Sequence, residues 1–332
     1  MARYNKLALP ADCRALWKSV FNDEEAFMDL YFSRRFSPQK TFYTTRAGKL
    51  AAAMQSLPYR MTFGDKQIQV GYVSGLATYP PYRHRGYARR VLHKSLRSLY
   101  RRGSVLSILI PATTELYDYY RSSGYAACFA GHLQTISSNS LSSLSPQTLT
   151  AEITDFIQTH LRQRPFSVQH SAEDLQDIGR VAALSGGGFY LQRDSQDQIL
   201  AVAVAERQTR SVIVKDAFGS PRHVASLLPQ IASPRCPVLF RTVHPSLPNT
   251  PYGMARIINA RKLLETYAAL FPQQQFTITI CNDNVIPQNN ATFRISAGRC
   301  TPVAPSKHTY TPDAAAENLL SPLHPVMTMM LD

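Results

Sequence analysis

The chain is poor in the features that mark membrane proteins and metalloproteins. No apolar stretch approaches the ~20 residues that a helix needs to span a bilayer, and the first residues lead into no apolar core of a signal peptide. The five cysteines are scattered without a C-x-x-C pair, and the nine histidines form no H-x-x-x-H pattern. We therefore expect a cytoplasmic protein with reduced, mostly buried thiols, no membrane partner and no metal.

Acidic residues are the scarcer charged type, and the imbalance is local. The sequence has 36 Lys and Arg against 22 Asp and Glu, a formal net charge of +14. Residues 66–114 hold nine of the basic residues and no acidic one. This pattern favours an anionic ligand, a plain solvated face or a nucleic-acid surface. Nucleic acid is the least favoured, because it needs exposed aromatic residues among the cations, whereas Leu92, Leu96 and Leu99 have core spacing.

The chain is long enough for more than one domain. Its 332 residues and 44% hydrophobic content suit two or three globular domains. Residues 136–148 are rich in serine, lack periodicity and are typical of a linker. We expect domains at 1–135, 136–248 and 249–332.

Several local signals predict single helices. Asn22 is expected to cap a helix that runs to residue 36, and Ser171 with Asp174 forms a capping-box pattern. Two further helices are predicted at 221–231 and 312–320.

The most informative segment is a basic turn between a strand and a helix. Residues 70–78 have the pattern of a strand, and residues 88–100 that of a helix with an apolar face. In the turn, Gly86 allows close approach of the backbone to a ligand. The N–H groups at a helix start are unpaired and carry partial positive charge, so the turn suits a pyrophosphate. Arg83 and Arg85 can add charge-assisted hydrogen bonds.

The spacing Arg83-x-x-Gly86-x-Ala88 resembles the acetyl-coenzyme A loop of the GNAT acetyltransferases, R/Q-x-x-G-x-G/A. The order of expected elements in residues 1–135 is similar to that family as well. The resemblance implies that the backbone of Leu76, Ala77 and Thr78 pairs with the pantetheine arm. It also implies that the pyrophosphate is held by Arg83, His84, Arg85, Gly86, Tyr87, Ala88 and Arg89. The alternative is an ordinary basic strand–turn–helix.

A second motif, Leu116-Tyr-Asp-Tyr-Tyr-Arg-Ser-Ser-Gly-Tyr125, resembles the F-Y-x-x-x-G-F/Y turn of the same family. On this resemblance the general-acid tyrosine falls on Tyr120. A phenol of pKa about 10 is a reasonable proton donor to a coenzyme A thiolate. The alternatives are Tyr117 as the donor, and Tyr119 and Tyr120 as packing aromatics.

The rest of the chain resembles the Eis (enhanced intracellular survival) acetyltransferases, which join a GNAT domain, a GNAT-like domain without a cofactor loop and a sterol-carrier-protein-like domain. The middle segment repeats the order strand, strand, turn, helix, strand but lacks the arginine–glycine cradle. The expected fold class is α/β (α+β), with an N-terminal GNAT fold, a degenerate second GNAT-like unit and a C-terminal sterol-carrier-protein-like α+β domain. The chain is shorter than the usual Eis protein.

The chain ends in an apolar tail before Asp332. In Eis-like proteins the C-terminal carboxylate reaches the active site, so the resemblance assigns the terminal carboxylate of Asp332 as a base or as an anchor for a cationic amine. Because an α-carboxylate has a pKa of about 3.5, the anchor is the safer role. The alternative is a tail that only packs on the third domain. Ser74 either positions water or the amine or is only a strand residue, and Glu25 and Asp29 either border the acceptor or are only solvated.

Together these patterns predict an Eis-like N-acetyltransferase that moves the acetyl group of acetyl-CoA directly to a primary amine. The acceptor is a small molecule or a peptide, and polyamines, aminoglycosides and lysine side chains all stay open. One alternative is a non-catalytic coenzyme A-binding or sensing protein, and a weaker one is a basic nucleic-acid-binding protein. A homo-oligomer is compatible with either enzyme or sensor.

Overall fold

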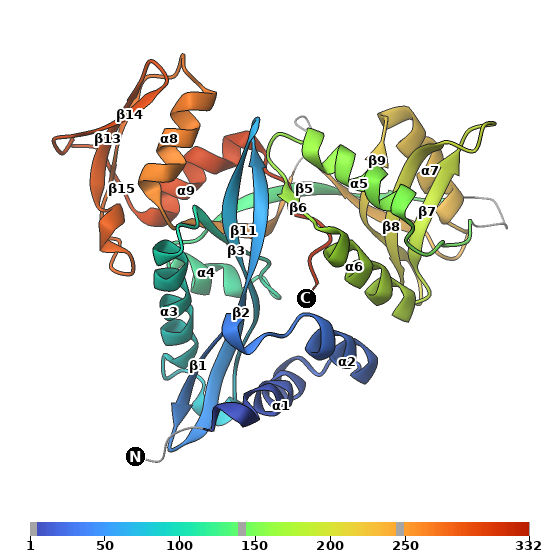
Figure 1. Ribbon diagram of the computed structural model, residues 1–332, viewed down its shortest axis with the longest axis horizontal. Coiled ribbons are helices and arrows are strands. Elements are labelled where there is room, and N and C mark those ends of the chain that lie inside the picture. Colours follow the sequence, from blue (N-terminus) through green and yellow to red (C-terminus); the bar gives the residue numbers. More distant parts are fainter. Residues whose placement is uncertain (1–4, 139–143, 244–248, 332) are drawn as a thin grey trace. The chain divides into compact units, whose positions relative to one another are not determined.

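The computed structural model describes residues 5–138, 144–243 and 249–331 (Figure 1). The chain divides into two compact units. Unit 1 comprises the residues up to 129 together with 252–325, and unit 2 comprises 130–251 together with 326–331. The predicted segment 1–135 therefore shares a unit with most of the predicted segment 249–332. The three-domain division stays a prediction.

Unit 1 is built on a sheet in the strand order β1-β2-β3-β4-β11. The strands are β1 (Thr41–Arg46), β2 (Lys49–Phe63), β3 (Lys66–Thr78), β4 (Leu106–Leu109) and β11 (Thr250–Ile257). β1, β2 and β3 are antiparallel neighbours, whereas β3 and β4 run parallel. β11 pairs antiparallel with β4 from Met254 to Ile257. A strand from the C-terminal part of the chain therefore extends the sheet of the N-terminal part.

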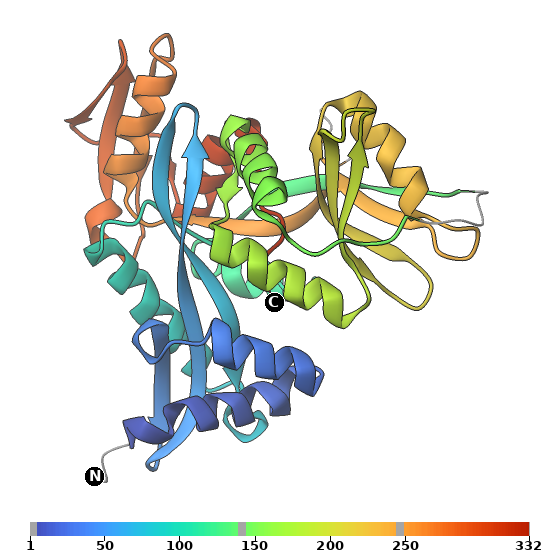
Figure 2. The ribbon, with the colours of Figure 1, turned by 45° about the vertical axis from the view of Figure 1, so that its right-hand side comes forward.

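Helices cover both faces of this sheet (Figure 2). α1 (Leu9–Phe21) packs on β2 and β3 from one side, followed by α2 (Glu25–Arg34). α3 (Tyr87–Arg101) covers β1, β2 and β3 from the other side. Its residues Val91, Leu92, Leu96 and Leu99 are buried in one core cluster, so the apolar spacing inside the basic segment is core, as predicted.

The prediction for Asn22 was wrong. Asn22 has φ 55° and ends α1 in the left-handed region, and α2 begins at Glu25 after Glu24. Asparagine tolerates this conformation better than most residues, so it can end a helix as well as start one. α1 was not predicted, although Leu9, Cys13, Leu16 and Trp17 have helical spacing.

Unit 1 has a second sheet in the order β14-β13-β12-β15. Its strands are β12 (Phe276–Ile280), β13 (Ala291–Ser296), β14 (Arg299–Val303) and β15 (Thr309–Tyr310). α8 (Ala260–Leu270) packs on β13 and β14. α9 (Pro312–Leu320) has the predicted bounds.

Unit 2 is a sheet with a helix layer on each face. Its strand order is β5-β10-β9-β8-β7. The strands of this sheet are β5 (Ala126–Ile136), β7 (Gly188–Arg193), β8 (Ile199–Arg207), β9 (Val212–Gly219) and β10 (Val238–Thr242), and the short strand β6 (Val168–Gln169) lies outside this order. The helices are α5 (Ala151–Gln163), α6 (Ala172–Leu184) and α7 (Pro221–Ile231). The predicted capping box of α6 forms, and α7 has the predicted bounds.

The apolar tail belongs to unit 2. Met329 and Leu331 are buried in the core cluster that α5 and α6 form on the sheet, and Thr328 donates a hydrogen bond to Asp216. The alternative in which the tail packs on the third predicted domain therefore does not describe residues 326–331. Asp332 lies outside the described residues, and its predicted role stays a prediction.

Within the described ranges, no helix combines the length and the apolar character that crossing a membrane requires. The same residues contain no group of three or more His, Cys, Asp or Glu side chains placed to hold a metal ion.

Candidate active site

The sheet of unit 1 opens between β3 and β4. The two strands pair only from Val70 to Tyr72 on β3, although β3 continues to Thr78. β4 ends at Leu109, one residue beyond this pairing, and along its whole length it pairs with β11 on its other side. The edge of β3 beyond Tyr72, here called the wedge, therefore has no strand neighbour on the β4 side among the described residues, and its backbone groups there can pair with a ligand. The predicted pantetheine-binding residues 76–78 lie in this part of β3.

A β-bulge shapes β3 at the start of the wedge. Ala77 lies opposite Ala53, but Ser74 lies opposite Gln55, so β3 carries one extra residue there. The extra residue is Gly75, which has a φ of 60°. A Cβ at Gly75 would lie 2.1 Å from the Trp17 ring, so glycine is required both by conformation and by the close packing of α1.

The turn after β3 forms an exposed cradle of backbone N–H groups. Gly86 is the N-cap of α3 with φ 73°, and His84 also has positive φ, 58°. In the described structure no hydrogen bond engages the backbone N–H groups of residues 84–89. Residues 83–86 are exposed. Unpaired donors at the start of a helix of 15 residues make a site for an anion.

The side chains around the cradle differ in what they do. Arg83 Nε lies 3.4 Å from the Thr78 carbonyl, and Arg89 Nη2 lies 3.5 Å from Ser122 Oγ. Tyr87 is buried in the core cluster, with Arg90 stacked 4.7 Å above its ring. Tyr87 can therefore offer only its backbone to a ligand, whereas the exposed guanidinium groups of Arg83 and Arg85 can reach one.

The tyrosine motif lies on α4 (Leu116–Arg121) and the turn after it. Tyr120 is buried, and its ring packs against the rings of Tyr119 and Tyr125 at centroid distances of 5.2 and 5.8 Å. Tyr125 shares a buried hydrogen bond of 2.7 Å with Ser107, and burial raises its pKa. Tyr125 is therefore a packing residue.

Two buried hydroxyl groups, one on α4 and one on β3, lack a protein partner within the described parts of the chain: Tyr119 Oη and Thr78 Oγ1. Burial raises the pKa of Tyr119, although Arg89 acts in the opposite direction. A buried hydroxyl without a partner costs free energy unless a ligand or water satisfies it. Tyr119 was expected only as a packing residue. The sequence did not indicate that its buried hydroxyl is available to a ligand.

The turn after α4 is fixed from the C-terminal part of unit 1. Gly124 has φ 84°, and a Cβ there would collide with Arg256 of β11. Arg256 donates to the Ser123 carbonyl and, at 2.6 Å, to Asp283 Oδ1. Asp283 also accepts from the N–H groups of Val285 and Ile286. These contacts hold the turn that directly follows α4 and Tyr120.

His93 of α3 lies against the same turn. Its Nε2 is 3.3 Å from Ser123 Oγ. Burial and the positive charges of Arg256, Arg97 and Arg89 lower the pKa of His93 to about 4. His93 is therefore neutral near pH 7.

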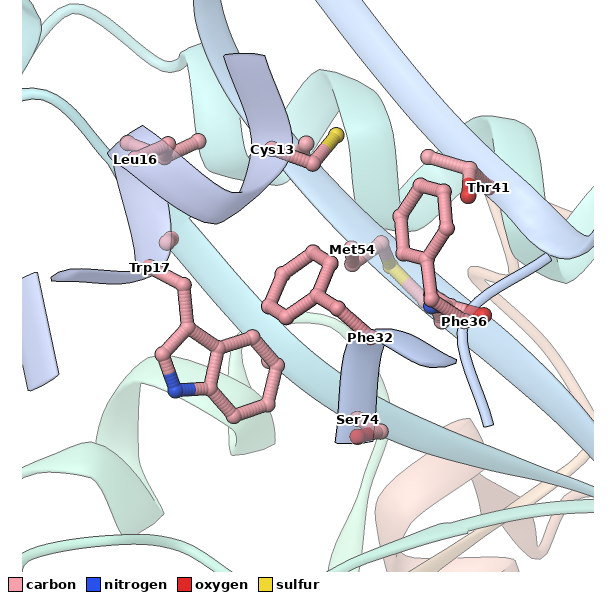
Figure 3. A pocket seen from close by; sticks show the side chains of 12 residues that line it. Cys13, Leu16, Trp17, Phe32, Phe36, Thr41, Met54 and Ser74 are labelled. Atoms are coloured by element: carbon pink, nitrogen blue, oxygen red, sulfur yellow. The ribbon is translucent and has the colours of Figure 1, made fainter. Parts of the chain in front are cut away.

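A pocket lies on the other face of the sheet, between α1, α2, β2 and the bulge of β3 (Figure 3). It is lined by Cys13, Leu16, Trp17, Phe32, Phe36, Thr41, Ala53, Met54, Gln55, Ser74, Gly75 and Ala77. Ser74 Oγ is buried and lies 2.6 Å from Tyr31 Oη. Trp17 Nε1 donates to Asp23 at 2.7 Å. Burial raises the pKa of Cys13 to about 12, so this thiol is not a nucleophile.

The acidic residues of α2 are engaged within unit 1. Arg14 Nη2 lies 2.6 Å from Glu25 and 2.9 Å from Asp29, and Lys18 lies 3.0 Å from Glu25. The two carboxylates were expected either to border the acceptor or to be solvated, and they are solvent-exposed, at 62% and 73%, while they form ion pairs between α1 and α2.

Most of the predicted site residues thus lie in neighbouring segments of unit 1. Residues 76–78, the cradle at 83–89 and α3 follow one another directly, and α4 with Tyr120 shares a core cluster with α3. Ser74 faces the pocket on the other side of the bulge. The roles of these residues stay predictions. Gln55, Arg256 and Asp283 were not predicted, because their partners are distant in the sequence and no motif contains them.

Comparison with known proteins identifies a domain family that the N-terminal part of the chain resembles. Residues 6–128 match the family model described as an acetyltransferase (GNAT) domain. The chain has no significant match among curated proteins.

Solved structures resemble nearly the whole chain. A conserved protein of unknown function from Enterococcus faecalis, described as a probable N-acyltransferase, has a TM-score of 0.74 at 16% identity and covers 93% of this chain and 86% of its own. A GCN5-related N-acetyltransferase from Anabaena variabilis has a TM-score of 0.72 at 16% identity, with 95% and 88% covered. Eis1 from Mycobacterium abscessus has a TM-score of 0.72 at 12% identity, with 96% and 88% covered.

At these identities the likeness establishes the fold, which is the mixed α/β class that the sequence predicted. The family model adds the activity class for the part of the chain that holds the wedge, the cradle and the tyrosine motif. Residues 6–128 therefore match an acetyltransferase domain of the GNAT type.

Proposed function

We propose that the chain is an N-acetyltransferase that moves the acetyl group of acetyl-CoA directly to a primary amine. The observation that carries the proposal is the continuity of the wedge with the cradle. The open backbone of residues 76–78 can pair with a pantetheine arm, and the unpaired N–H groups of residues 84–89 can hold a pyrophosphate. Arg83 and Arg85 supply positive charge beside the cradle.

The proposed reaction needs no covalent intermediate on the protein. The neutral amine attacks the thioester carbonyl, the new C–N bond forms, and the C–S bond breaks. The coenzyme A thiolate takes a proton from a general acid, which we assign as the Tyr120 phenol. The nitrogen of the acceptor loses its extra proton to water. Tyr120 is then reprotonated from solvent. Holding the two reactants together supplies much of the rate, and proton transfer from a positioned phenol adds to it.

Three further assignments belong to the same proposal. Ser74, hydrogen-bonded to Tyr31, positions the amine or a water. The terminal carboxylate of Asp332 anchors the acceptor. The chain belongs to the Eis-like group of acetyltransferases, and its third domain is similar to a sterol carrier protein. The likeness to Eis1 supports this assignment, as does the four-stranded sheet with α8 in the C-terminal part of unit 1.

The test is amine-dependent thiol release from acetyl-CoA with a panel of amines, together with calorimetric binding of acetyl-CoA. The proposal predicts release that depends on both substrates. Binding without release for any amine would favour the coenzyme A sensor, and steeply salt-dependent nucleic-acid binding without acetyl-CoA binding would favour the third interpretation.

A further inference from the structure

We propose that unit 1 holds a second ligand site, which takes a small phosphorylated polyol such as a sugar phosphate. The site is an open cleft of about 470 Å³, here called the α8 cleft, between residues 66–69 of β3, the loop between α3 and β4, and the first half of α8. This volume lies within the range of about 300–1,000 Å³ that is typical of pockets for small molecules. β3 has 13 residues, so roughly 40 Å of extended strand separates the α8 cleft from the cradle. The inference goes beyond the proposed function and does not depend on it.

Three cations from distant parts of the sequence line the α8 cleft. Lys66 begins β3, Arg102 ends α3, and Lys262 lies in the first turn of α8. Within the described ranges of the chain, no ion pair engages any of the three. Like charges that the fold brings to one cleft repel each other, and a bound anion relieves that repulsion. The cleft therefore favours a ligand with negative charge.

The acidic residue of the lining leaves this positive charge in place. Glu265 Oε1 lies 2.8 Å from Arg261 Nε, so its carboxylate is already paired with a cation outside the lining. Asp65 precedes Lys66 in the sequence but does not line the cleft. A phosphate monoester carries a charge of about −1.5 to −2 near pH 7 and offers three oxygens as acceptors. It suits two lysines and an arginine better than a single carboxylate does.

The edge of β3 adds backbone groups to the cleft. Lys66 pairs with Phe63 of β2, whereas the Gln69 carbonyl accepts a hydrogen bond of 2.8 Å from Val105 N–H on the opposite edge. Because alternate residues of a strand direct their backbone groups to the same edge, the N–H of Gln67 faces the side of Val105. β4 begins only at residue 106, so no described strand covers Gln67 there. Its N–H can donate to a phosphate oxygen.

Lys262 is held at the cleft by the loop after α3. Its Nζ donates to the Gly103 carbonyl at 3.3 Å, and a Cβ at Gly103 would lie 2.8 Å from the same atom. Gly103 has a φ of 79°, so glycine is favoured both by conformation and by the approach of the lysine. An ammonium group has three donors. The contact with the loop uses one of them and leaves the others for a ligand.

The remainder of the lining suits hydroxyl groups better than a nucleotide base. The side chains of Gln69, Glu265 and Thr266 supply donors and acceptors. The apolar lining residues Ile68 and Val105 are buried and small, and the lining contains no aromatic ring on which a base could stack. The cleft therefore fits a phosphate that is carried by a short polyol or a sugar.

Calorimetric titration of the full chain tests the site. The probes are glycerol 3-phosphate, ribose 5-phosphate and fructose 1,6-bisphosphate, and the comparison ligands are ribose and citrate. We expect saturable binding of at least one of the three phosphates, weaker binding of citrate and no binding of ribose. Absence of saturable binding for all three phosphates would overturn the inference, and so would tighter binding of citrate than of any phosphate. The titrations contain no acetyl-CoA and no amine, so either failure leaves the proposed function standing.

Variants locate the bound phosphate. Lys66→Met and Lys262→Met each remove one charge and keep the length of the side chain, so the affinity for the tightest phosphate should fall roughly tenfold in each. Lys94→Met makes the same change on an exposed lysine of α3 outside the cleft, and Arg85→Met removes an exposed cation of the cradle. Both controls should keep the affinity within about twofold.

The pattern across the variants decides between the two anion sites. A loss with Arg85→Met and none with Lys66→Met or Lys262→Met would place the phosphate in the cradle and overturn the inference. Equal losses with Lys94→Met and the two cleft variants would show only a general effect of charge and would overturn it as well. If Lys262→Met does not fold, Lys66→Met gives the same comparison.

Discussion

Arg256 and Asp283 form an ion pair of 2.6 Å in which both side chains are 1% exposed. The pair joins β11 to the segment after β12, and Arg256 also bonds the turn of the tyrosine motif through Ser123. The backbone N–H groups of Val285 and Ile286 and the amide of Asn289 complete the coordination of the Asp283 carboxylate. The C-terminal part of unit 1 thus fixes the turn that follows α4 in the tyrosine motif.

The first prediction concerns this pair. Asp283→Asn leaves the buried guanidinium without its counter-charge, so the free energy of unfolding should fall by about 3 kcal/mol or more. Urea denaturation measures the loss. Glu265→Gln, which breaks the exposed pair with Arg261, is the control and should change little. Equal effects of the two variants would contradict the role given to the buried pair.

The second prediction concerns the cradle. Gly86 and Gly48 have nearly the same left-handed φ, 73° and 76°, and a Cβ at either would meet no atom within 4 Å. Alanine at either position should therefore cost similar stability, on the order of 1 kcal/mol. Only Gly86→Ala should weaken acetyl-CoA binding, because it distorts the N–H groups at the start of α3. Calorimetry that found the same affinity for both variants would remove Gly86 from the cradle.

The third prediction separates the tyrosines of α4. Tyr120→Phe should lower kcat by roughly 10²–10⁴-fold and leave the affinity for acetyl-CoA nearly unchanged. Tyr117→Phe is the matched control on the same helix and should retain most of its activity. The opposite ranking of the two variants would move the general acid to Tyr117.

The fourth prediction concerns pH. The pKa of His93 is about 4 in the folded chain, below its ordinary value of 6.5. Between these values the unfolded state binds the proton and the folded state does not, so stability falls as the pH falls from 6.5 toward 4. His93→Gln should make this fall shallower, and the exposed His308→Gln should not. Parallel curves for the chain and His93→Gln in thermal unfolding would show that His93 is not protected from protonation.

How much the sequence predicts depends on how local the cause is. α7 and α9 have the predicted bounds, and the capping box of α6 forms, because each depends on residues a few positions apart. The cradle could be predicted for the same reason, since β3, Gly86 and α3 are contiguous. Asn22 shows the limit of local reasoning, because the same residue type caps helix starts and helix ends.

The support of the site could not be predicted. β11 pairs with β4 across more than a hundred residues of sequence, and the burial of Arg256 and Asp283 follows from that pairing. A basic and an acidic residue in the sequence read as surface charges until both are placed in the same core. The hydrogen bond from the Ser37 N–H to the buried Gln55 side chain likewise appears only in the folded chain, because the two residues lie 18 positions apart.

The most direct test of the whole account follows both products in one reaction. Acetyl-CoA labelled in its acetyl group is mixed with the chain and with each member of a panel of primary amines in turn, and the free thiol and the labelled amide are measured together. The account predicts equal amounts of the two products, formed only when chain and amine are both present. Saturable binding of acetyl-CoA with neither product, or thiol release without any labelled amide, would contradict direct acetyl transfer to an amine.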